Sequence, residues 1–260
     1  MVKRFKIMYP LANGNNEKRN AYVYLPESYY ENRRKRYPVL YMFDGHNVFF
    51  DSDATYGKCW GMKEYMDATG TELIIAAVEC NHSPDNGRLQ EYSPYTFNDS
   101  HLGHIVGRGE KTMHWFINKF KVRIDKNYRT LPDRAHTFIA GSSMGGLMSV
   151  YALMKFNHVF SRAAALSPSL WTSPIHLQNL ISKVPVDPDT VLYMDYGSGE
   201  FGNHNGMKAQ FGEFAALMMG RGIHLNCRIV PGGTHCEASW ERQIPFFMNT
   251  LMYDYDQMQK

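Results

Sequence analysis

The feature that most constrains this chain is the alternation of short apolar runs with amphipathic stripes along nearly its whole length. Several runs are apolar almost throughout, which is typical of strands buried on both faces of a sheet. The stripes repeat with the period of a helix that packs one face on a core. Strands that alternate with helices predict an α/β fold with a mostly parallel central sheet and helices on both of its faces.

Six runs are expected to be strands: AYVYLP (21–26), PVLYMF (38–43), LIIAAV (73–78), HTFIA (136–140), VLYMDY (191–196) and HLNCRIV (224–230). Three stripes are expected to be core-facing helices: Met113, Phe116, Ile117 and Phe120; Met207, Phe211, Phe214, Ala215 and Met218; and Trp240, Ile244, Phe247 and Leu251. Residues 79–110 are rich in Asn, Ser, Gly and Pro, so they are predicted to form a long loop at the edge of the sheet.

The composition fits a single domain covering residues 1–260. Hydrophobic residues make up 44% of the chain and charged residues 20%, which is enough apolar material for one substantial core. There is no internal repeat, low-complexity tract or linker that would divide the chain. The sequence does not reveal the oligomeric state, so a homo-oligomer stays open.

Charge and targeting signals argue against two classes of partner. The net charge of +3 is too small to predict binding to nucleic acid or to a membrane surface. The densest basic run, ENRRKRYP (31–38), is interpreted as a solvated loop before a strand. The sequence shows no signal peptide and no membrane-spanning segment, and its four cysteines have neither disulfide-framework nor zinc-knuckle spacing. These features predict a cytoplasmic protein with reduced thiols.

The stretch TFIAGSSMGGLMSV (137–150) joins a predicted strand to a predicted helix through a turn of small residues. Residues 141–145, GSSMG, match G-x-S-x-G, in which the central serine is held on a tight turn above a sheet. Because the flanking strand and helix are the context that this motif requires, Ser143 is the candidate nucleophile. Ser142 is less favoured, because the glycine spacing centres on Ser143.

A serine nucleophile needs a base, and the base needs an orienting carboxylate. In this strand–turn–helix arrangement the chain order is serine, acid, histidine. His235 lies in the Gly-rich stretch VPGGTHCEASW just after a predicted strand, where α/β sheets place active residues, so it is the candidate base. His224 begins a strand, and His204 is assigned an ordinary loop role. Two acids follow the strand 191–196, and Glu200 in the loop is preferred to Asp195, which is expected to lie still within the strand.

The tetrahedral intermediate of acyl transfer needs an oxyanion hole made of N–H donors. One donor is expected to be the backbone N–H of Met144, which follows the nucleophile. The other is expected in the loop after the strand 38–43, where Gly45 lets the backbone turn and the N–H of His46 is the candidate. The His46 side chain is not assigned a catalytic role.

Taken together, these motifs resemble the putative-esterase branch of the α/β-hydrolases, which contains feruloyl esterases, enterochelin esterases, S-formylglutathione hydrolases and mycolyltransferases. The resemblance covers about residues 20–252 and rests on PVLYMFDGHNVF, GRLQEYSPY, FKVRIDKNYRT, AGSSMGGLMSVYAL, FSRAAALSPSLW, YGSGE and GGTHCEASW. It implies an α/β-hydrolase fold and a Ser-His-acid triad whose acid lies in a G-x-x-D/E turn. Residues 197–200, GSGE, match that turn, with glutamate in place of the aspartate of many members.

The resemblance also implies a function. We expect a serine carboxylesterase that hydrolyses small acyl or hydroxycinnamoyl esters through an acyl-enzyme on Ser143, without a metal or other cofactor. An acyltransferase or a siderophore-type esterase using the same triad is the alternative. A binding scaffold without activity is disfavoured by the intact Ser143, Glu200 and His235, and S-formylglutathione hydrolysis is disfavoured because the stretch DGHN (44–47) departs from the oxyanion loop of those enzymes.

Four further residues are candidates for the surroundings of the site. Trp60 and Trp171 are proposed as walls of a substrate pocket, with plain core packing as the alternative for each. Arg88 and Glu91 are expected to brace a loop through an ion pair with each other, with a role in substrate binding as the alternative.

Overall fold

The structure, a computed structural model, describes residues 1–11, 13–202 and 205–253. Its centre is an eight-stranded sheet in the order β1-β2-β4-β3-β7-β8-β9-β10. The strands are β1 Val2–Pro10, β2 Asn16–Tyr24, β3 Val39–Met42, β4 Ile74–Val78, β7 Thr137–Ser142, β8 Arg162–Leu166, β9 Val191–Gly197 and β10 His224–Val230. Strands β4, β3, β7, β8, β9 and β10 are mutually parallel. Strand β2 pairs with β4 in antiparallel fashion, and β1 pairs with β2 in antiparallel fashion. The mostly parallel sheet predicted from the sequence is confirmed.

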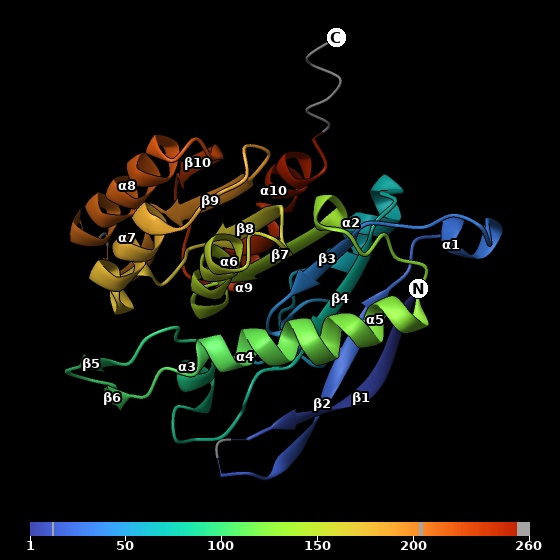
Figure 1. Cartoon of the computed structure of the whole chain (residues 1–260), viewed down its shortest axis with the longest axis horizontal. Coiled ribbons are helices and arrows are strands. Elements are labelled where there is room, and N and C mark those ends of the chain that lie inside the picture. The colour runs from blue at the N-terminus through green and yellow to red at the C-terminus, as the bar shows by residue number, and fades with distance from the viewer. Residues whose placement is uncertain (12, 203–204, 254–260) are drawn as a thin grey trace.

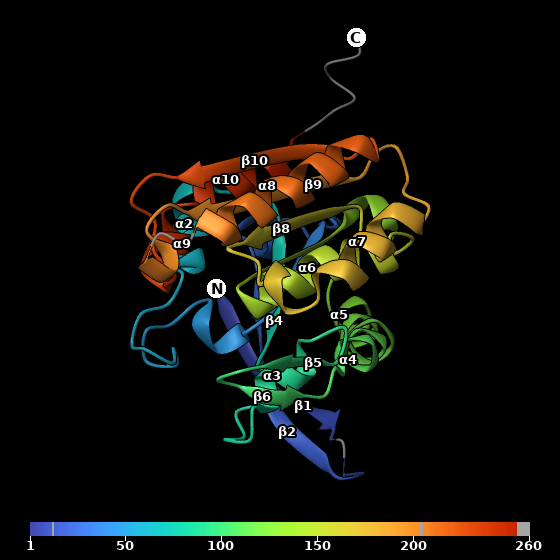
Figure 2. The same ribbon diagram turned by 90° about the vertical axis from the view of Figure 1, so that its left-hand side faces the viewer.

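Helices cover both faces of the sheet. They are α1 Ser28–Glu31, α2 Met62–Thr69, α3 Gly87–Glu91, α4 Gly109–Trp115, α5 Val122–Asn127, α6 Met144–Lys155, α7 Pro174–Lys183, α8 Asn205–Gly220, α9 Glu237–Glu241 and α10 Ile244–Leu251. One core contains side chains of α4, α6, α7 and α8, and the other contains side chains of α2, α9 and α10. Figure 2 shows the sheet twisting from β10 at the top to β1 and β2 at the bottom.

All six predicted strands are present, but the sheet contains two more, β1 and β8, that are not among them. The sequence of β1, VKRFKIMYP, mixes basic residues with apolar ones, because β1 is an edge strand with one face in solvent. Ile7 and Tyr9 point to the core and Lys6 and Met8 lie outside. Exposed lysines on such an edge discourage pairing with another chain.

The segment 79–110 is not the structureless loop that its composition suggested. It contains α3 and a small antiparallel hairpin of β5 Phe97–Asp99 and β6 Gly103–Ile105, which projects from the body of the molecule (Figure 1). Elements this short carry too few residues for a periodic pattern to emerge. The segment places Arg88 and His82 beside the loops at the carboxyl ends of the strands.

The remaining short elements are helical segments that lie between the larger strands and helices. They are η1 Gly45–Asn47, η2 Phe116–Lys121, η3 Arg134–His136, η4 Leu170–Thr172 and η5 Glu200–Gly202, of which η2 is a π-helix that makes α4 and α5 continuous. Among the described residues, no helix combines the length and apolar character that crossing a bilayer requires.

Candidate active site

Ser143 lies at the point where β7 ends and α6 begins. Its backbone angles are φ 57° and ψ −120°, a region that non-glycine residues rarely adopt. The turn is tight, because a Cβ on Gly141 would lie 2.7 Å from the carbonyl carbon of Gly145. The Ser143 N–H donates to the carbonyl of Leu166 on the neighbouring strand, which fixes the turn to the sheet.

Three of the predicted residues meet in one hydrogen-bonded chain. Ser143 Oγ lies 2.9 Å from Nε2 of His235, and Nδ1 of His235 lies 2.8 Å from Oε2 of Glu200. These residues come from the ends of three strands, β7, β10 and β9, which bring together positions far apart in the sequence. A ring that contacts a hydroxyl on one side and a carboxylate on the other is arranged to accept the hydroxyl proton.

Glu200 is buried, with 1% of its surface exposed, and both of its oxygens have partners. Oε1 accepts hydrogen bonds from the Gly197 N–H at 2.8 Å and from the Ser167 hydroxyl at 2.5 Å. Ser167 in turn accepts a bond from the indole N–H of Trp240 at 3.0 Å. Sequence reasoning missed Ser167, because no motif distinguishes it from the other serines of residues 167–173.

Asp195, the alternative acid, lies within β9 and has different partners. Its carboxylate accepts hydrogen bonds from the Tyr193 hydroxyl at 2.8 Å and from the Ser167 N–H at 3.1 Å. Burial raises the pKa of Asp195 from 3.8 to about 7, against the lowering effect of these two bonds. The structure thus brings Glu200, and not Asp195, to the histidine.

Met144 and His46, whose backbone N–H groups are the candidate oxyanion donors, lie after β7 and β3, which are adjacent strands. Met144 is the first residue of α6, directly after Ser143. His46 lies in η1, and its side chain lines the cleft together with Ser143. A Cβ on Gly45 would lie 2.7 Å from the backbone nitrogen of Val78, so the loop can pass this close to β4 only with glycine there.

The expected ion pair between Arg88 and Glu91 is wrong, because each has another partner. Arg88 forms a two-pronged pair with Asp44, with Nε 2.8 Å from Oδ1 and Nη2 2.7 Å from Oδ2. Glu91 pairs with the buried Arg19 at 2.6 Å. Arg88 does brace a loop, since Asp44 immediately precedes η1 and has a left-handed backbone with φ 53°.

The Arg88–Asp44 pair also sets the ionisation of the loop. Burial alone would raise the pKa of Asp44, but the charge and hydrogen bonds of Arg88 outweigh it and hold this pKa below its ordinary value. Asp44 therefore stays a carboxylate well into the acid range, and the loop that carries His46 stays anchored to α3.

A cleft of about 700 Å³ opens above Ser143 and His235. Many of the residues that line it are polar, among them His46, Asn47, Lys58, Asn81, Arg88 and Glu237, and Trp240 adds an aromatic wall. A small apolar pocket lies on the other side of the His235 ring, lined by Trp171, Tyr196, Phe201, Met207 and Phe211.

The two tryptophans predicted as pocket walls have different positions. Trp171 is partly buried at the small apolar pocket. Trp60 is 3% exposed and packs on Trp240 and Phe247, so it lies in the core behind the cleft. The wall expected from Trp60 is formed by Trp240, whose ring meets the edge of His235 at 5.1 Å.

Of the other two candidate histidines, the structure describes only His224. His224 begins β10 and pairs in register with Val191 at the start of β9, so it lies at the opposite end of the strands from the triad. His204 lies outside the described residues.

A mostly parallel sheet, a serine on a strained strand-to-helix turn and a histidine beyond the last strand define an α/β-hydrolase fold. Solved structures agree with this class. A ferulic acid esterase superposes with a TM-score of 0.70 at 20% identity, covering 96% of this chain and 97% of that one. An IroE-like serine hydrolase from Shewanella oneidensis superposes with a TM-score of 0.71 at 20% identity, covering 96% and 79%.

The model of the family described as putative esterase matches residues 12–249. The chain therefore belongs to the putative esterase family, a family of carboxylic ester hydrolases. An uncharacterized protein of Bacillus subtilis (strain 168), YbbA, is 26% identical over 186 residues, which are 68% of this chain and 67% of that protein. An endo-1,4-beta-xylanase/feruloyl esterase of Xylanibacter ruminicola is 23% identical over 237 residues, which are 89% of this chain and 29% of that much longer protein.

Proposed function

We propose that this protein is a serine ester hydrolase that forms an acyl-enzyme on Ser143. The observation that carries the proposal is the chain of short contacts from Ser143 through His235 to Glu200 at the floor of an open cleft. In this reaction Ser143 Oγ attacks the ester carbonyl carbon while Nε2 of His235 takes the hydroxyl proton. Glu200 holds the ring in the required tautomer and stabilises the imidazolium.

Collapse of the tetrahedral intermediate breaks the bond to the alcohol, which leaves with the proton from His235. A water molecule then attacks the acyl-enzyme, with His235 again as the base, and the acid is released as Ser143 regains its proton. The backbone N–H groups of Met144 and His46 are the proposed donors to the oxyanion in both steps.

We propose hydroxycinnamoyl or small acyl esters of a polar alcohol as substrates. The cleft above Ser143, with a volume of about 700 Å³ and many polar lining residues, has room for an ester of a hydroxyl-rich alcohol such as a sugar. Similarity to a protein named endo-1,4-beta-xylanase/feruloyl esterase supports this substrate class.

The test is hydrolysis of p-nitrophenyl acetate and of methyl ferulate by the wild type, Ser143→Ala and Ser142→Ala. Loss of the nucleophile should lower kcat by about 10⁴-fold or more. Ser142→Ala removes the neighbouring hydroxyl and should retain most of the turnover. Unchanged turnover in Ser143→Ala would overturn the mechanism, and a preference for acetate over ferulate would overturn the hydroxycinnamoyl assignment.

A further inference from the structure

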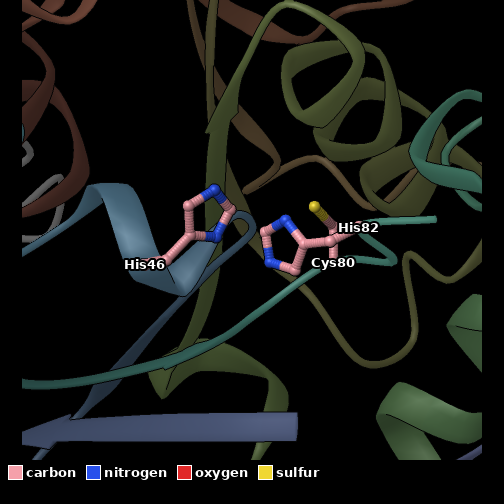
Figure 3. A group of neighbouring side chains, drawn as sticks. All are labelled: His46, Cys80 and His82. Atoms are coloured by element: carbon pink, nitrogen blue, oxygen red, sulfur yellow. The ribbon is translucent and has the colours of Figure 1, made fainter. Parts of the chain in front are cut away.

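Three potential metal ligands lie together in the wall of the cleft and have no part in the proposed mechanism. They are the side chains of His46, Cys80 and His82, and one ligand atom of each lies within 4.8 Å of the others. They come from the loops after β3 and β4, which are adjacent parallel strands, so their carboxyl ends deliver these residues to the same place. Figure 3 shows the two imidazole rings facing each other with the thiol of Cys80 beside His82.

The buried histidine of this group has an unsatisfied nitrogen. His46 is only 5% exposed, and its Nε2 lies 3.0 Å from the hydroxyl of Thr55. Its Nδ1 is buried without a hydrogen-bond partner and faces His82 in Figure 3. Most buried polar atoms in native structures have a hydrogen-bond partner, so the unpaired Nδ1 of His46 calls for an explanation.

Packing of the rings does not supply that explanation. The imidazoles of His46 and His82 meet edge to face, with centroids 4.6 Å apart. This contact accounts for the spacing of the rings, yet it leaves Nδ1 of His46 unpaired. A metal ion between the two rings would use the lone pair of that nitrogen, while the bond to Thr55 holds the ring in place.

We propose that His46, Cys80 and His82 form a three-ligand site for a divalent transition metal, with Zn²⁺ as the ion that best fits the donors. Histidine imidazole and cysteine thiolate are both typical ligands of zinc. Binding replaces the thiol proton of Cys80, which is released to solvent, and two nitrogen lone pairs complete the protein ligands.

Zinc binding requires the three ligand atoms to move slightly closer together. Ligand atoms around a tetrahedral zinc ion are about 3.3–3.8 Å apart, given zinc–ligand bonds of about 2.0–2.3 Å. His82 is exposed and free to make most of the adjustment, whereas His46 and Cys80 are buried and already fixed.

The position of the site leaves one coordination position of the metal ion open to the cleft. All three residues line the cleft that also contains Ser143 and His235, so the fourth ligand comes from the cleft, either water or a polar group of a bound molecule. The proposal rests on these contacts alone and does not depend on the protein being an esterase.

The experiment uses the full chain after metal is removed with a chelator and the chelator is dialysed away. Calorimetric titration with ZnCl₂ measures affinity and stoichiometry, and titration with Co²⁺ reports a thiolate ligand through a sulfur-to-cobalt absorption band. The informative variants are His82→Ala and Cys80→Ser. The matched control is Cys236→Ser, because Cys236 also lines the cleft, next to His235.

We expect one Zn²⁺ per chain in the wild type and in Cys236→Ser. His82→Ala should bind at least about tenfold more weakly, since even residues that only support a ligand change affinity by this amount. Cys80→Ser should lose the sulfur-to-cobalt band. Because His82 is exposed, His82→Ala should keep the fold even if Cys80→Ser does not. No binding by the wild type, equal binding by His82→Ala, or loss of the band in Cys236→Ser would overturn the proposal.

Discussion

The hydroxyl of Ser167 donates a hydrogen bond to Oε1 of Glu200, with 2.5 Å between Ser167 Oγ and this oxygen. Oε1 is the carboxylate oxygen that His235 does not contact. Ser167 therefore fixes the carboxylate from behind, in a site where the proposed chemistry depends on how Glu200 points at the ring. The Trp240 indole N–H, donating to Ser167, sets the direction of that hydroxyl. Supporting bonds of this kind hold a reacting group in its productive geometry.

Ser167→Ala tests this positioning. Loss of a hydrogen bond to a buried charged group costs about 1.5–3 kcal/mol, so kcat for p-nitrophenyl acetate should fall about 10–100-fold. KM should change little, because Ser167 is 3% exposed and does not line the cleft above Ser143. Trp240→Phe keeps an aromatic ring at this position but removes the N–H that donates to Ser167. Because the Ser167 hydroxyl can still donate to Glu200, this variant should have a smaller effect on kcat. A rise in KM with unchanged kcat would contradict a role through Glu200.

The choice of acid is tested by removing one charge at a time. Glu200→Gln should lower kcat by about 10⁴-fold, because an amide facing Nδ1 favours the wrong tautomer of His235. Asp195→Asn should retain most of the activity, since Asp195 bonds to Tyr193 and Ser167 rather than to the ring. The reverse pattern in steady-state kinetics would assign the acid to Asp195.

The parts of this fold that the sequence predicts are those whose local pattern matches their burial. Strands β3, β4, β7 and β9 are buried along their whole length, so their residues are mostly apolar and easy to recognise. Strand β1 shows only an alternation diluted by lysines. Ser143, Glu200 and His235 were predictable as candidates because each lies beside a distinctive Gly-rich turn that follows a strand.

The partners that no local pattern specifies were missed. Arg88 meets Asp44 rather than Glu91 because β4 lies next to β3 in the sheet, which brings the segments after both strands together. Trp60 is apolar and large, which predicts burial but not which surface it faces. His46 joins Cys80 and His82 for the same reason as Arg88 joins Asp44, so the group has no motif spacing in the sequence.

Arg88→Ala is expected to damage both the loop and the stability of the fold. It leaves the buried Asp44 carboxylate without its two-pronged partner, which should cost about 1–3 kcal/mol in the free energy of unfolding. It should also lower kcat/KM, because Asp44 precedes the loop that carries His46. Arg88→Lys keeps the positive charge but cannot make both hydrogen bonds to Asp44, so its stability and kcat/KM should lie between those of the wild type and Arg88→Ala. Urea unfolding and steady-state kinetics measure the two effects, and a variant equal to wild type in both would refute the bracing role.

The pH dependence of this pair has a definite sign. The pKa of Asp44 is lowered in the folded protein, so the stabilisation from the pair is fully present above the ordinary aspartate pKa and is lost as the pH falls through the folded value. The difference in unfolding free energy between the wild type and Arg88→Ala should therefore shrink in acid. A difference that stays constant down to about pH 3 would contradict the assignment.

Asp195 should have the opposite effect on the pH dependence of the unfolding free energy. Its folded-state pKa of about 7 lies above the ordinary value of 3.8, mainly because of burial. A group with a raised pKa contributes stability that is fully present below the unfolded value and is lost as the pH rises through the folded value. Asp195→Asn replaces the carboxyl with an uncharged group of the same shape, so the unfolding free energy of the wild type should fall relative to this variant between about pH 4 and pH 8. Glu91, whose pKa burial also raises to about 7, is present in both proteins, so the difference isolates Asp195. Urea titrations across this range measure it, and parallel stability curves for the two proteins would mean that Asp195 is ionised throughout.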